Sequence, residues 1–368
     1  MLRIGIVGAG SISQRAHLPA ARRTPDVEVV ALCDRRPKLL CEVASRWGIP
    51  RTHGHLDDML ADPDVEAVIA CVPTIAHHEV ACAALRAGRH VLVEKPMATS
   101  VARAQEMLRA EAEGGGRLMI GHHKRYDLGV EAARRALQAG GIEAPQLVTY
   151  HWSCGDWTSM GPEPVIETDE PGLPWTYEYP DGVESVGARE LYGTALEMFT
   201  HMTNLLRWLV GDPTRVLYAA KPEGIRGMLT LDFGGFTGHL TEGPHYPDAP
   251  VWFEQVTVWG DAGRLEVNLP PNLELNKPAE VRVWEARAGT WQTPVVPWSW
   301  AFQRQLEHFA RCVQTGEPFR TPGADALIDL EIAEAIARAA EAGANGWPLD
   351  THDKGIAHAR PLVGHNAG

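Results

Sequence analysis

The sequence lacks the features that mark several specialised classes of protein. Its six cysteines include no CxxC pair, no apolar run reaches the length of a membrane span, and no internal repeat or low-complexity tract is present. We therefore expect no transmembrane helix, no disulfide framework and no metal site. The cysteines are interpreted as reduced residues, most of them in the core.

An excess of basic residues is also missing, since the formal net charge is −13. This charge argues against nucleic acid and anionic membranes as partners. A strand is expected already at Leu2–Val7, which leaves no room for a signal peptide, so we expect a cytoplasmic protein. The 368 residues are too many for one ordinary core and suggest two domains.

The first part of the chain alternates strands with helices. Short apolar runs predict strands at Leu2–Val7, Val27–Cys33, Ala67–Val72, Val91–Val93 and Leu118–Gly121, and helices are expected at residues 39–47, 57–60, 79–87 and 100–113. Repeated strand–helix units imply a doubly wound parallel sheet with right-handed crossovers. We assign residues 1–125 to a Rossmann dinucleotide-binding domain.

The first strand runs into Gly8-Ala9-Gly10-Ser11-Ile12-Ser13, a GxGxxG pattern with serine in the third glycine position. Gly8 permits a tight turn, and Gly10 lets the backbone approach a pyrophosphate at a helix N-terminus. The second strand ends at Asp34, where a carboxylate binds an adenosine ribose and favours NAD. Arg35 and Arg36 follow and would attract a 2′-phosphate, so NADP stays open.

The strand Val91–Val93 leads directly into Glu94, Lys95 and Pro96. A buried parallel strand delivers such residues to the carboxyl edge of the sheet, where open α/β folds bind their ligands. Lys95 is therefore a candidate proton acceptor for a substrate hydroxyl. The alternative is an ordinary surface lysine in a loop.

Beyond residue 126 the pattern changes. Strands are expected at residues 146–152, 216–221, 227–233, 236–241, 253–259, 263–267 and 281–285, and helices at 130–139, 190–210, 300–314 and 324–341. Short turns between successive strands imply a mostly antiparallel sheet. We assign residues 126–368 to an α+β domain for substrate binding and oligomerisation, and expect about 358–368 to be loose.

Residues 153–190 form a long irregular stretch that is rich in proline, glycine, acidic and aromatic residues. Its aromatic side chains include Trp157, Trp175, Tyr177 and Tyr179. A loop of this length in a compact domain usually has a function. We expect a substrate lid or a contact between subunits.

The helix expected at residues 190–210 carries a polar stripe, formed by Thr194, Glu197, His201 and Asn204. Three interpretations stay open. The stripe is a solvated face, or Glu197 and His201 form an acid–base pair, or they form half of a metal site.

Five segments together resemble the Gfo/Idh/MocA family of nicotinamide-dependent oxidoreductases. They are Gly8–Ser13 with Ala16-His17-Leu18-Pro19-Ala20, then Pro73-Thr74-Ile75-Ala76-His77, then Glu94-Lys95-Pro96, then Gly121-His122-His123-Lys124-Arg125-Tyr126, and the helix from Gly193 to Asn204. The resemblance covers most of the chain, and Glu94-Lys95-Pro96 is its most specific signature.

The resemblance implies a Rossmann domain followed by an open-faced α/β domain, with helices on one side of a sheet that often forms the oligomer contact. It also implies that Lys95 is the catalytic acid/base, that the Lys95–Pro96 bond is cis, and that His201 relays a proton or binds the substrate with Glu197. The residues implied at the cofactor are Gly8, Gly10, Ser11, Ile12, Asp34, Arg35, Val72, Pro73, His77, Glu94, Lys95 and His123. Those implied at the substrate are Tyr126, Glu197 and His201. Trp152 is a further substrate candidate, because its ring offers a flat apolar face to a sugar; the alternative is a core or interface residue.

Four positions depart from the family pattern. Glu197 stands in place of an aspartate, Asn204 in place of an acid, and Thr74 and His123 in place of asparagines near the nicotinamide. These changes put the substrate and the geometry around it in doubt, whereas Lys95 and His201 are both retained.

These observations predict an enzyme that transfers hydride between a secondary alcohol of a sugar, polyol or cyclic analogue and NAD, with NADP as the second cofactor candidate. Lys95 is expected to act as acid/base with assistance from His201, on a small-molecule substrate, in a homodimer or homotetramer formed through the second sheet. One alternative is a redox-neutral lyase or glycoside-cleaving enzyme that oxidises its sugar transiently and keeps its NAD. Another is a sensor that binds the cofactor without chemistry.

Overall fold

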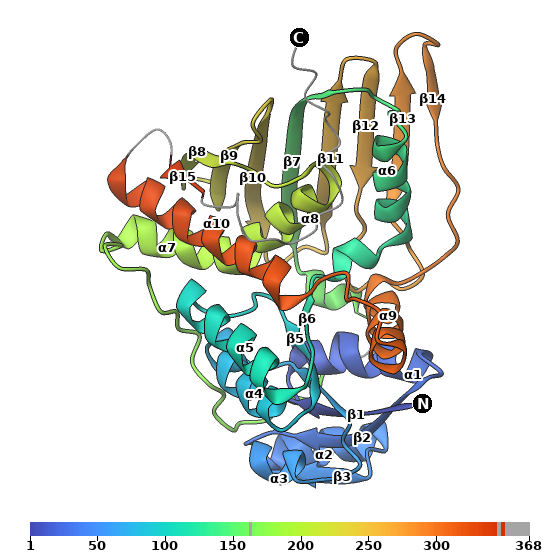
Figure 1. Cartoon of the computed structure of the whole chain (residues 1–368), viewed down its shortest axis with the longest axis vertical. Helices are drawn as coiled ribbons and strands as arrows, with labels where there is room; N and C mark the ends of the chain where they lie inside the picture. The colour runs from blue at the N-terminus through green and yellow to red at the C-terminus, as the bar shows by residue number, and fades with distance from the viewer. Residues whose placement is uncertain (162–163, 344–346, 350–368) are drawn as a thin grey trace. The chain divides into compact units, whose positions relative to one another are not determined.

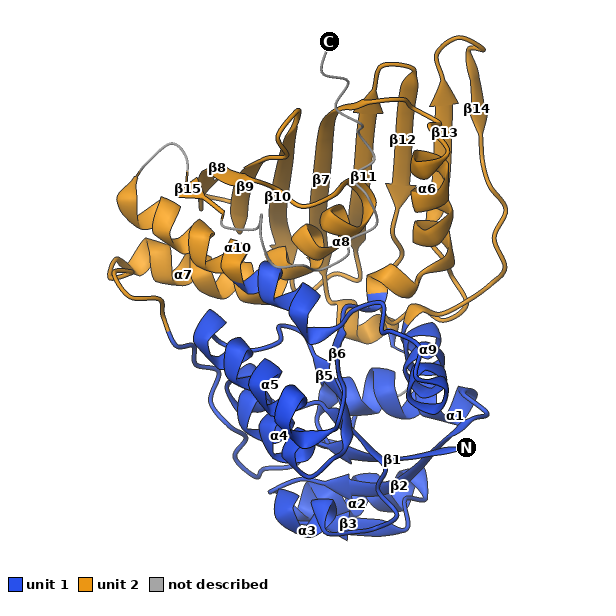
Figure 2. Ribbon diagram, viewed as in Figure 1, with its two compact units in different colours: residues 1–123, 161–178, 302–330 blue, residues 124–160, 179–301, 331–368 orange. Residues whose placement is uncertain are grey.

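The computed structural model describes residues 1–161, 164–343 and 347–349 (Figure 1). The expectation for residues 358–368 lies outside this part of the chain. The described chain forms two compact units (Figure 2). Unit 1 comprises residues 1–123, 161–178 and 302–330, and unit 2 comprises residues 124–160, 179–301 and the chain from 331 onward. Residues 161–178 and 302–330, which the sequence pattern placed in the second domain, therefore belong to unit 1.

Unit 1 is built on a six-stranded parallel sheet with the order β3-β2-β1-β4-β5-β6. The strands are β1 (Leu2–Val7), β2 (Val27–Cys33), β3 (Arg51–His53), β4 (Ala67–Ala70), β5 (His90–Glu94) and β6 (Leu118–Gly121). The central residues of all these strands except the short edge strand β3 are buried, as expected for apolar strands covered on both faces. This order places a topological switch point beside β1, where doubly wound folds bind nucleotides.

Helices connect these strands. They are η1 (Ser13–His17), α1 (Leu18–Arg23), α2 (Pro37–Trp47), α3 (Leu56–Leu60), α4 (Thr74–Arg86) and α5 (Val101–Gly114). Unit 1 also contains residues 302–315 of α9 (Ala301–Thr315) and residues 323–330 of α10 (Gly323–Ala342). The expectation that α4 begins at Glu79 is wrong. The helix begins at Thr74, directly after its N-cap residue Pro73. Residues 74–78, which were expected to precede the helix, therefore belong to it.

Unit 2 is built on a nine-stranded mixed sheet with the order β14-β13-β12-β11-β7-β10-β9-β8-β15. The strands are β7 (Pro145–Gly155), β8 (Arg215–Ala220), β9 (Gly227–Asp232), β10 (Thr237–Tyr246), β11 (Trp252–Gly260), β12 (Gly263–Asn268), β13 (Glu280–Glu285), β14 (Thr290–Gln292) and β15 (Trp347–Pro348). Only the pairing of β7 with β10 is parallel among the pairs described. The predicted combination of a Rossmann sheet with a mostly antiparallel sheet is confirmed.

The helices of unit 2 lie on one face of this sheet (Figure 2). They include α6 (Leu128–Gln138), α7 (Val186–Thr194), η4 (Ala195–Phe199) and α8 (Thr200–Val210). The expectation of one regular helix over residues 190–210 is wrong in two respects. The helical run begins at Val186, where Ser185 caps it, and η4 is a π-helical turn, a local widening often found at functional sites.

Candidate functional site

In the glycine-rich loop after β1, the fold requires one glycine, and a second glycine leaves space for a ligand. Gly8 has φ +97°, and a Cβ on it would collide with the carbonyl oxygen of Cys71, so the fold itself requires this glycine. A Cβ on Gly10 would meet no atom within 4 Å. Neither packing nor a positive φ requires a glycine there, so its small size leaves space for a group outside the protein. The loop therefore fits a pyrophosphate that approaches the backbone.

The helical run that follows starts at Ser11, which is exposed, and continues through the half-buried Ile12. The side chain of Ser13 is buried and donates its hydroxyl to the carbonyl oxygen of Gly8. A third glycine is not needed at this position because serine fits and fixes the loop.

Asp34 lies against this loop at the end of β2 and is 8% exposed. Its Oδ2 accepts the backbone N–H of Ala9 at 2.8 Å, and its carboxylate also accepts the backbone N–H and the guanidinium of Arg36 at 2.8–2.9 Å. Burial opposes ionisation, but these hydrogen bonds hold the pKa of Asp34 below its usual value. Of the two arginines singled out from the sequence, Arg35 is exposed and Arg36 contacts the carboxylate.

Glu94 ends β5 and forms a buried ion pair with a residue of the first helical run. Nε2 of His17 lies 2.7 Å from Oε1 of Glu94, and the imidazole is 2% exposed. Burial disfavours a charged imidazole, but the Cys71 thiol and the Glu94 carboxylate raise the pKa of His17 to about 10. Burial likewise opposes ionisation of Glu94, yet His17 keeps its pKa below the usual value. The pair fixes a negative charge beside Lys95.

Lys95 follows at the carboxyl edge of the sheet, and its bond to Pro96 is cis, as the resemblance implied. Its backbone N–H donates to Oε2 of Glu94 at 3.2 Å. His77 of α4 is buried, with Nδ1 2.7 Å from the carbonyl oxygen of Pro96 and Nε2 2.9 Å from that of Val72. His77 thus connects the β4 and β5 loops through their backbones.

The remaining predicted cofactor residues of unit 1 lie in the same pair of loops or beside them. Val72 and Pro73 are half-buried between β4 and α4. His123, after β6, is buried and stacks on Phe302 of α9, with ring centroids 4.3 Å apart. The edge of the Phe302 ring also meets His17, at 5.8 Å. Phe302 therefore supports two of the histidines near Glu94.

Unit 2 contains a cluster of aromatic and charged side chains around Trp152 of β7. Trp152 is 4% exposed, and its ring meets the edge of His201 with centroids 5.7 Å apart. Lys124 places its Nζ 4.3 Å from the Trp152 ring centroid and bonds Glu254. Among the described residues, the buried indole N–H of Trp152 has no hydrogen-bond acceptor. A buried donor without an acceptor is unfavourable unless something else supplies one.

Glu254 of β11 lies beside Trp152 in the antiparallel register. Its carboxylate accepts both the ammonium of Lys124 and the hydroxyl of Tyr150. Burial and the neighbouring carboxylate raise the pKa of Tyr150 well above its usual value, so this phenol remains a donor. The cluster is held together by charge and by the register of two strands.

Two predicted substrate residues of unit 2 have a less direct relation to this cluster. Tyr126, in the short helix η2 (His123–Tyr126), is 1% exposed. Glu197 is half-buried within the π-turn of η4, one turn before His201. Their roles at the substrate remain predictions.

Several residues at these sites were given no role by the sequence argument. His17, Lys124 and Glu254 all bond a carboxylate or an ammonium in the two sites. His17 and Lys124 had a visible signal, because they lie in the Ala16–Ala20 and Gly121–Tyr126 segments that carry the resemblance, whereas Glu254 had none. The described residues contain no group of three or more His, Cys, Asp and Glu arranged to hold a metal ion. No helix within the described ranges is long and apolar enough to cross a membrane.

Comparison with known proteins agrees with this geometry. Residues 2–122 match the model of an oxidoreductase family with an NAD-binding Rossmann fold, the Gfo/Idh/MocA family. The chain is 35% identical over 354 residues to a 1,5-anhydro-D-fructose reductase of Ensifer adhaerens, covering 93% of this chain and 97% of that protein. The chain belongs to this family. Its first unit is accordingly the NAD(P)-binding domain of an oxidoreductase.

Two further relatives show how far the similarity extends. A 4-carboxy-2-hydroxymuconate-6-semialdehyde dehydrogenase of Sphingobium sp. is 34% identical over 170 residues, so the match spans 46% of this chain and about half, 53%, of that protein. An aldose–aldose oxidoreductase of Caulobacter crescentus has a similar fold, with a TM-score of 0.75 at 24% identity, covering 95% of this chain and 99% of that one. The first comparison shows similarity of sequence over part of the chain and the second similarity of fold over nearly all of it, whereas the substrates in the two names differ.

Proposed function

We propose that this family member is an NAD-dependent dehydrogenase or reductase that acts on a secondary alcohol of a sugar, polyol or related cyclic compound. The observation that carries the proposal is the arrangement at the carboxyl edge of the unit 1 sheet. Lys95 follows Glu94, whose charge His17 fixes, on the sheet that also presents Gly10 and Asp34. A nucleotide loop and a candidate acid/base on one edge suit an alcohol oxidation.

Lys95 is assigned the proton transfer. In its neutral form its amine accepts the proton of the substrate hydroxyl while the hydrogen on the same carbon leaves as hydride. NAD, when bound, supplies the acceptor for that hydride. Glu94 and His123 are assigned to the nicotinamide end, Gly8, Gly10, Ser11 and Ile12 to the pyrophosphate, and Asp34 and Arg35 to the adenosine ribose. Val72, Pro73 and His77 are assigned to the part of the cofactor site between these groups.

Unit 2 is assigned the recognition of the substrate. Trp152 offers a flat apolar ring and a buried indole N–H that lacks an acceptor among the described residues. Both suit a sugar, which presents apolar C–H faces and hydroxyl oxygens. His201, at the edge of this ring, is assigned the onward transfer of the proton or the fixing of a hydroxyl, with Glu197 and Tyr126 as further contacts.

The names of two relatives support this substrate class. The anhydrofructose reductase and the aldose–aldose oxidoreductase both act on sugars by name, whereas the muconate semialdehyde dehydrogenase acts on a different carbon skeleton. The assay therefore begins with sugars and polyols.

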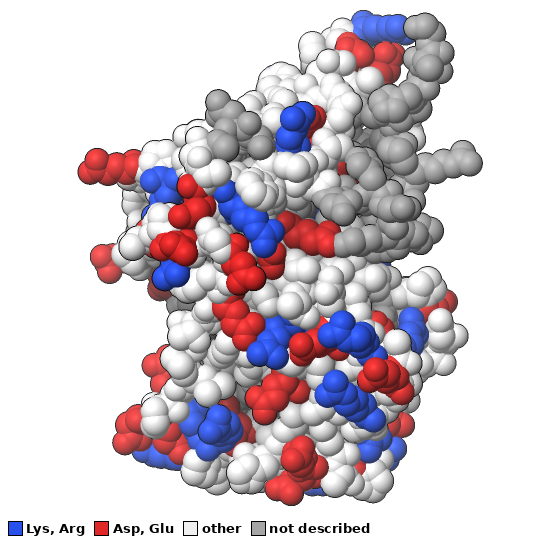
Figure 3. All heavy atoms as spheres, turned by 60° about the vertical axis from the view of Figure 1, so that its left-hand side comes forward, with Lys and Arg blue, Asp and Glu red and all other residues white. Residues whose placement is uncertain are grey.

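The surface of the chain supports a small molecule as the main partner. On the face in Figure 3, acidic and basic side chains are interspersed rather than gathered into one basic field. The outer face of the unit 2 sheet exposes Met228, Phe253 and Trp259 at 38%, 50% and 40%. We propose that a second copy covers them in a homodimer or homotetramer. All six cysteines are free thiols, which supports a cytoplasmic location.

The test is the absorbance of NADH at 340 nm with a panel of sugars, polyols and glycosides, for the wild type, Lys95→Ala and Lys277→Ala. Lys277 is an exposed lysine of unit 2 that pairs with Glu274, so its loss removes the same charge without affecting the edge of unit 1. We expect turnover in the wild type and in Lys277→Ala, and a fall of about 100-fold or more in Lys95→Ala. Equal turnover in all three would remove Lys95 from the mechanism.

A second candidate function is redox-neutral sugar chemistry with a retained NAD. The observation that favours it is the bonding of residues 164–178 to the nucleotide loop and to α2, because a segment fastened there would slow exchange of a bound nucleotide. This enzyme would be isolated with NAD bound and would convert its sugar without net NADH. Rapid exchange of bound NAD with free NAD would exclude it.

A further inference from the structure

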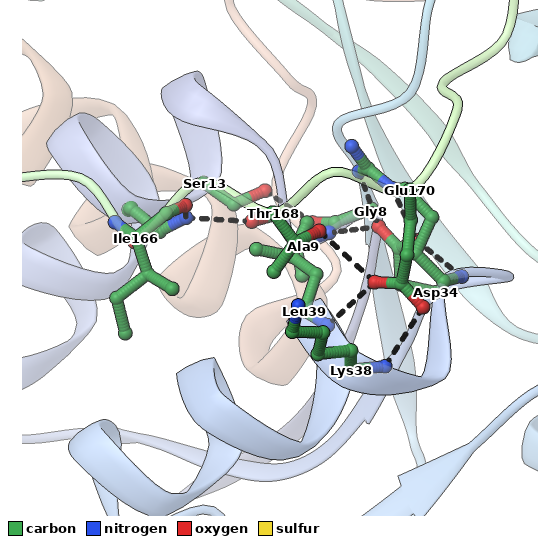
Figure 4. A network of polar contacts seen from close by, with 11 residues as sticks. Gly8, Ala9, Ser13, Asp34, Lys38, Leu39, Ile166, Thr168 and Glu170 are labelled. Atoms are coloured by element: carbon green, nitrogen blue, oxygen red, sulfur yellow. Dashed lines mark hydrogen bonds and ion pairs between the residues drawn. The ribbon is translucent and has the colours of Figure 1, made fainter.

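Residues 164–178, part of the stretch expected to be a substrate lid or a subunit contact, lie on the nucleotide-binding residues of unit 1 (Figure 4). Gln14 accepts the backbone N–H of Ile166 at 2.8 Å and donates to its carbonyl oxygen at 3.0 Å. The same Gln14 amide donates to the carbonyl oxygen of Ala9, within the glycine-rich loop. Arg46 of α2 donates to the carbonyl oxygen of Pro164 at 2.8 Å.

Glu170 of this segment occupies the N-terminus of α2. Its carboxylate accepts the backbone N–H groups of Lys38 and Leu39, at 3.0 and 2.9 Å, and the hydroxyl of Thr168 at 3.0 Å. Desolvation opposes ionisation, but the two backbone amides and Thr168 lower the pKa of Glu170. A charged carboxylate thus takes the first free amides of an eleven-residue helix, the groups that best bind an anion.

This helix terminus is the neighbour of the ribose-binding carboxylate. The backbone N–H of Arg36, the N-cap residue of α2, donates to Oδ1 of Asp34 at 2.9 Å. In dinucleotide folds an acid at the end of the second strand binds the ribose 2′-hydroxyl, the oxygen that carries the additional phosphate in NADP. A 2′-phosphate bound beside Asp34 would therefore need the amides that Glu170 already holds.

Two of the basic side chains between β2 and the start of α2, Arg36 and Lys38, are also engaged by carboxylates, whereas Arg35 is exposed. The guanidinium of Arg36 bonds Asp34, and Nζ of Lys38 bonds Asp169 at 2.8 Å. Arg36 and Lys38, which would attract a 2′-phosphate, are thus paired with carboxylates. The partner of Lys38 is Asp169, which directly precedes Glu170. The segment brings two negative charges, on Asp169 and Glu170, to the N-terminus of α2, next to the end of β2 that carries Asp34.

We infer that Glu170 is a specificity-determining residue that makes this protein select NAD over NADP, by occupying the α2 amides and repelling the 2′-phosphate. The inference rests on the proposed binding of a nicotinamide dinucleotide at Gly8–Asp34. It assigns a function in cofactor selection to a residue more than 130 positions away in the sequence from Asp34. Neither Glu170 nor its segment contributes to the GxGxxG pattern.

The experiment measures the dissociation constants of NAD+ and NADP+ by isothermal titration calorimetry with the full chain freed of nucleotide. The variants are Glu170→Gln, which keeps the shape, and Glu170→Ala, which also frees the amides. Glu167→Gln is the matched control, because it removes the same charge from an exposed residue three positions earlier in the segment. Circular dichroism and thermal melting confirm that each variant is folded.

We expect the wild type and Glu167→Gln to bind NAD+ more tightly than NADP+. In both Glu170 variants we expect the ratio of the two affinities to shift toward NADP+ by about tenfold or more, the scale of a charge-assisted hydrogen bond. A ratio equal to that of Glu167→Gln would overturn the inference. So would an equal loss of both nucleotides, which would make Glu170 only an anchor of its segment. If the wild type binds neither nucleotide, the proposed function itself fails. This result is distinct from the two results above, which would overturn only the inference about Glu170.

Discussion

The two units hold their functional charges in different ways. In unit 1, carboxylates at strand ends are fixed by short contacts within one sheet edge, as with Asp34 on the amide of Ala9 and Glu94 on His17. In unit 2, the charge on Glu254 is shared with Lys124 and Tyr150, from separate strands and a segment far away in sequence. The carboxylates of the first arrangement follow apolar strands that can be recognised in the sequence, whereas the second arrangement depends on which strands of the second sheet pair.

The largest expected effect comes from breaking the buried pair of unit 2. Lys124→Met leaves the fully buried charge of Glu254 without its ammonium and should lower the free energy of unfolding by about 3–5 kcal/mol. Combining it with Glu254→Gln, which keeps an acceptor for Tyr150, should recover more than half of that loss. Urea denaturation measures both variants. A double variant no more stable than Lys124→Met would show that the pair is not the source of the effect.

The next prediction distinguishes a glycine that binds the nucleotide from a glycine that the fold of unit 1 requires. A Cβ at Gly10 would meet no protein atom within 4 Å, so we expect Gly10→Val to keep normal thermal stability but to lose nucleotide affinity by about 100-fold or more. Gly8→Ala is the contrasting variant, because its Cβ collides with backbone and its φ is positive. It should lower stability by about 2 kcal/mol or more. If Gly10→Val binds NAD normally, the pyrophosphate is not at this loop.

The smallest effect concerns the charge on His17. Its pKa is raised in the folded protein to about 10, so its contribution to stability is fully present below the unfolded value of about 6.5. It is lost as the pH rises through about 10. We expect His17→Gln to cost about 1–3 kcal/mol at pH 7 and less at pH 10.5, by urea denaturation.

A direct check of this charge uses 15N-labelled histidine, since both ring nitrogens of His17 should remain protonated at pH 8.5 in NMR spectra. His239→Gln, at an exposed histidine of β10, is the control for the denaturation series. A neutral His17 ring at pH 8.5 would contradict the ion pair with Glu94.

The difference between the two units explains which features the sequence could predict. The glycine loop, Asp34 and Lys95 follow strands whose apolar runs are visible, so the sequence places them on one edge of a parallel sheet. The Lys124–Glu254 pair joins residues 130 positions apart, and no local pattern specifies which strand of the second sheet faces Lys124. The widened turn at Ala195–Phe199 is a difference of one residue in helical spacing, which the periodicity of side chains does not resolve.

The docking of residues 164–178 was the least predictable feature. An irregular segment has no periodicity, and its place depends on single contacts such as Glu170 on the amides of α2. Composition indicated a function for this stretch but not its partner. The strand β3 and the edge strands β14 and β15 were likewise missed, because they are only two or three residues long.

The most direct test of the account is a single-turnover measurement with enzyme in excess over substrate and NAD bound, following absorbance at 340 nm on addition of each sugar or polyol. This design detects hydride transfer even where the nucleotide is retained through the reaction. The account predicts that at least one sugar or polyol reduces the bound NAD in the wild type, and that Lys95→Ala binds NAD with similar affinity but reduces it about 100-fold more slowly or worse. Reduction at the wild-type rate in Lys95→Ala would contradict it, as would bound NAD that no compound of the panel reduces.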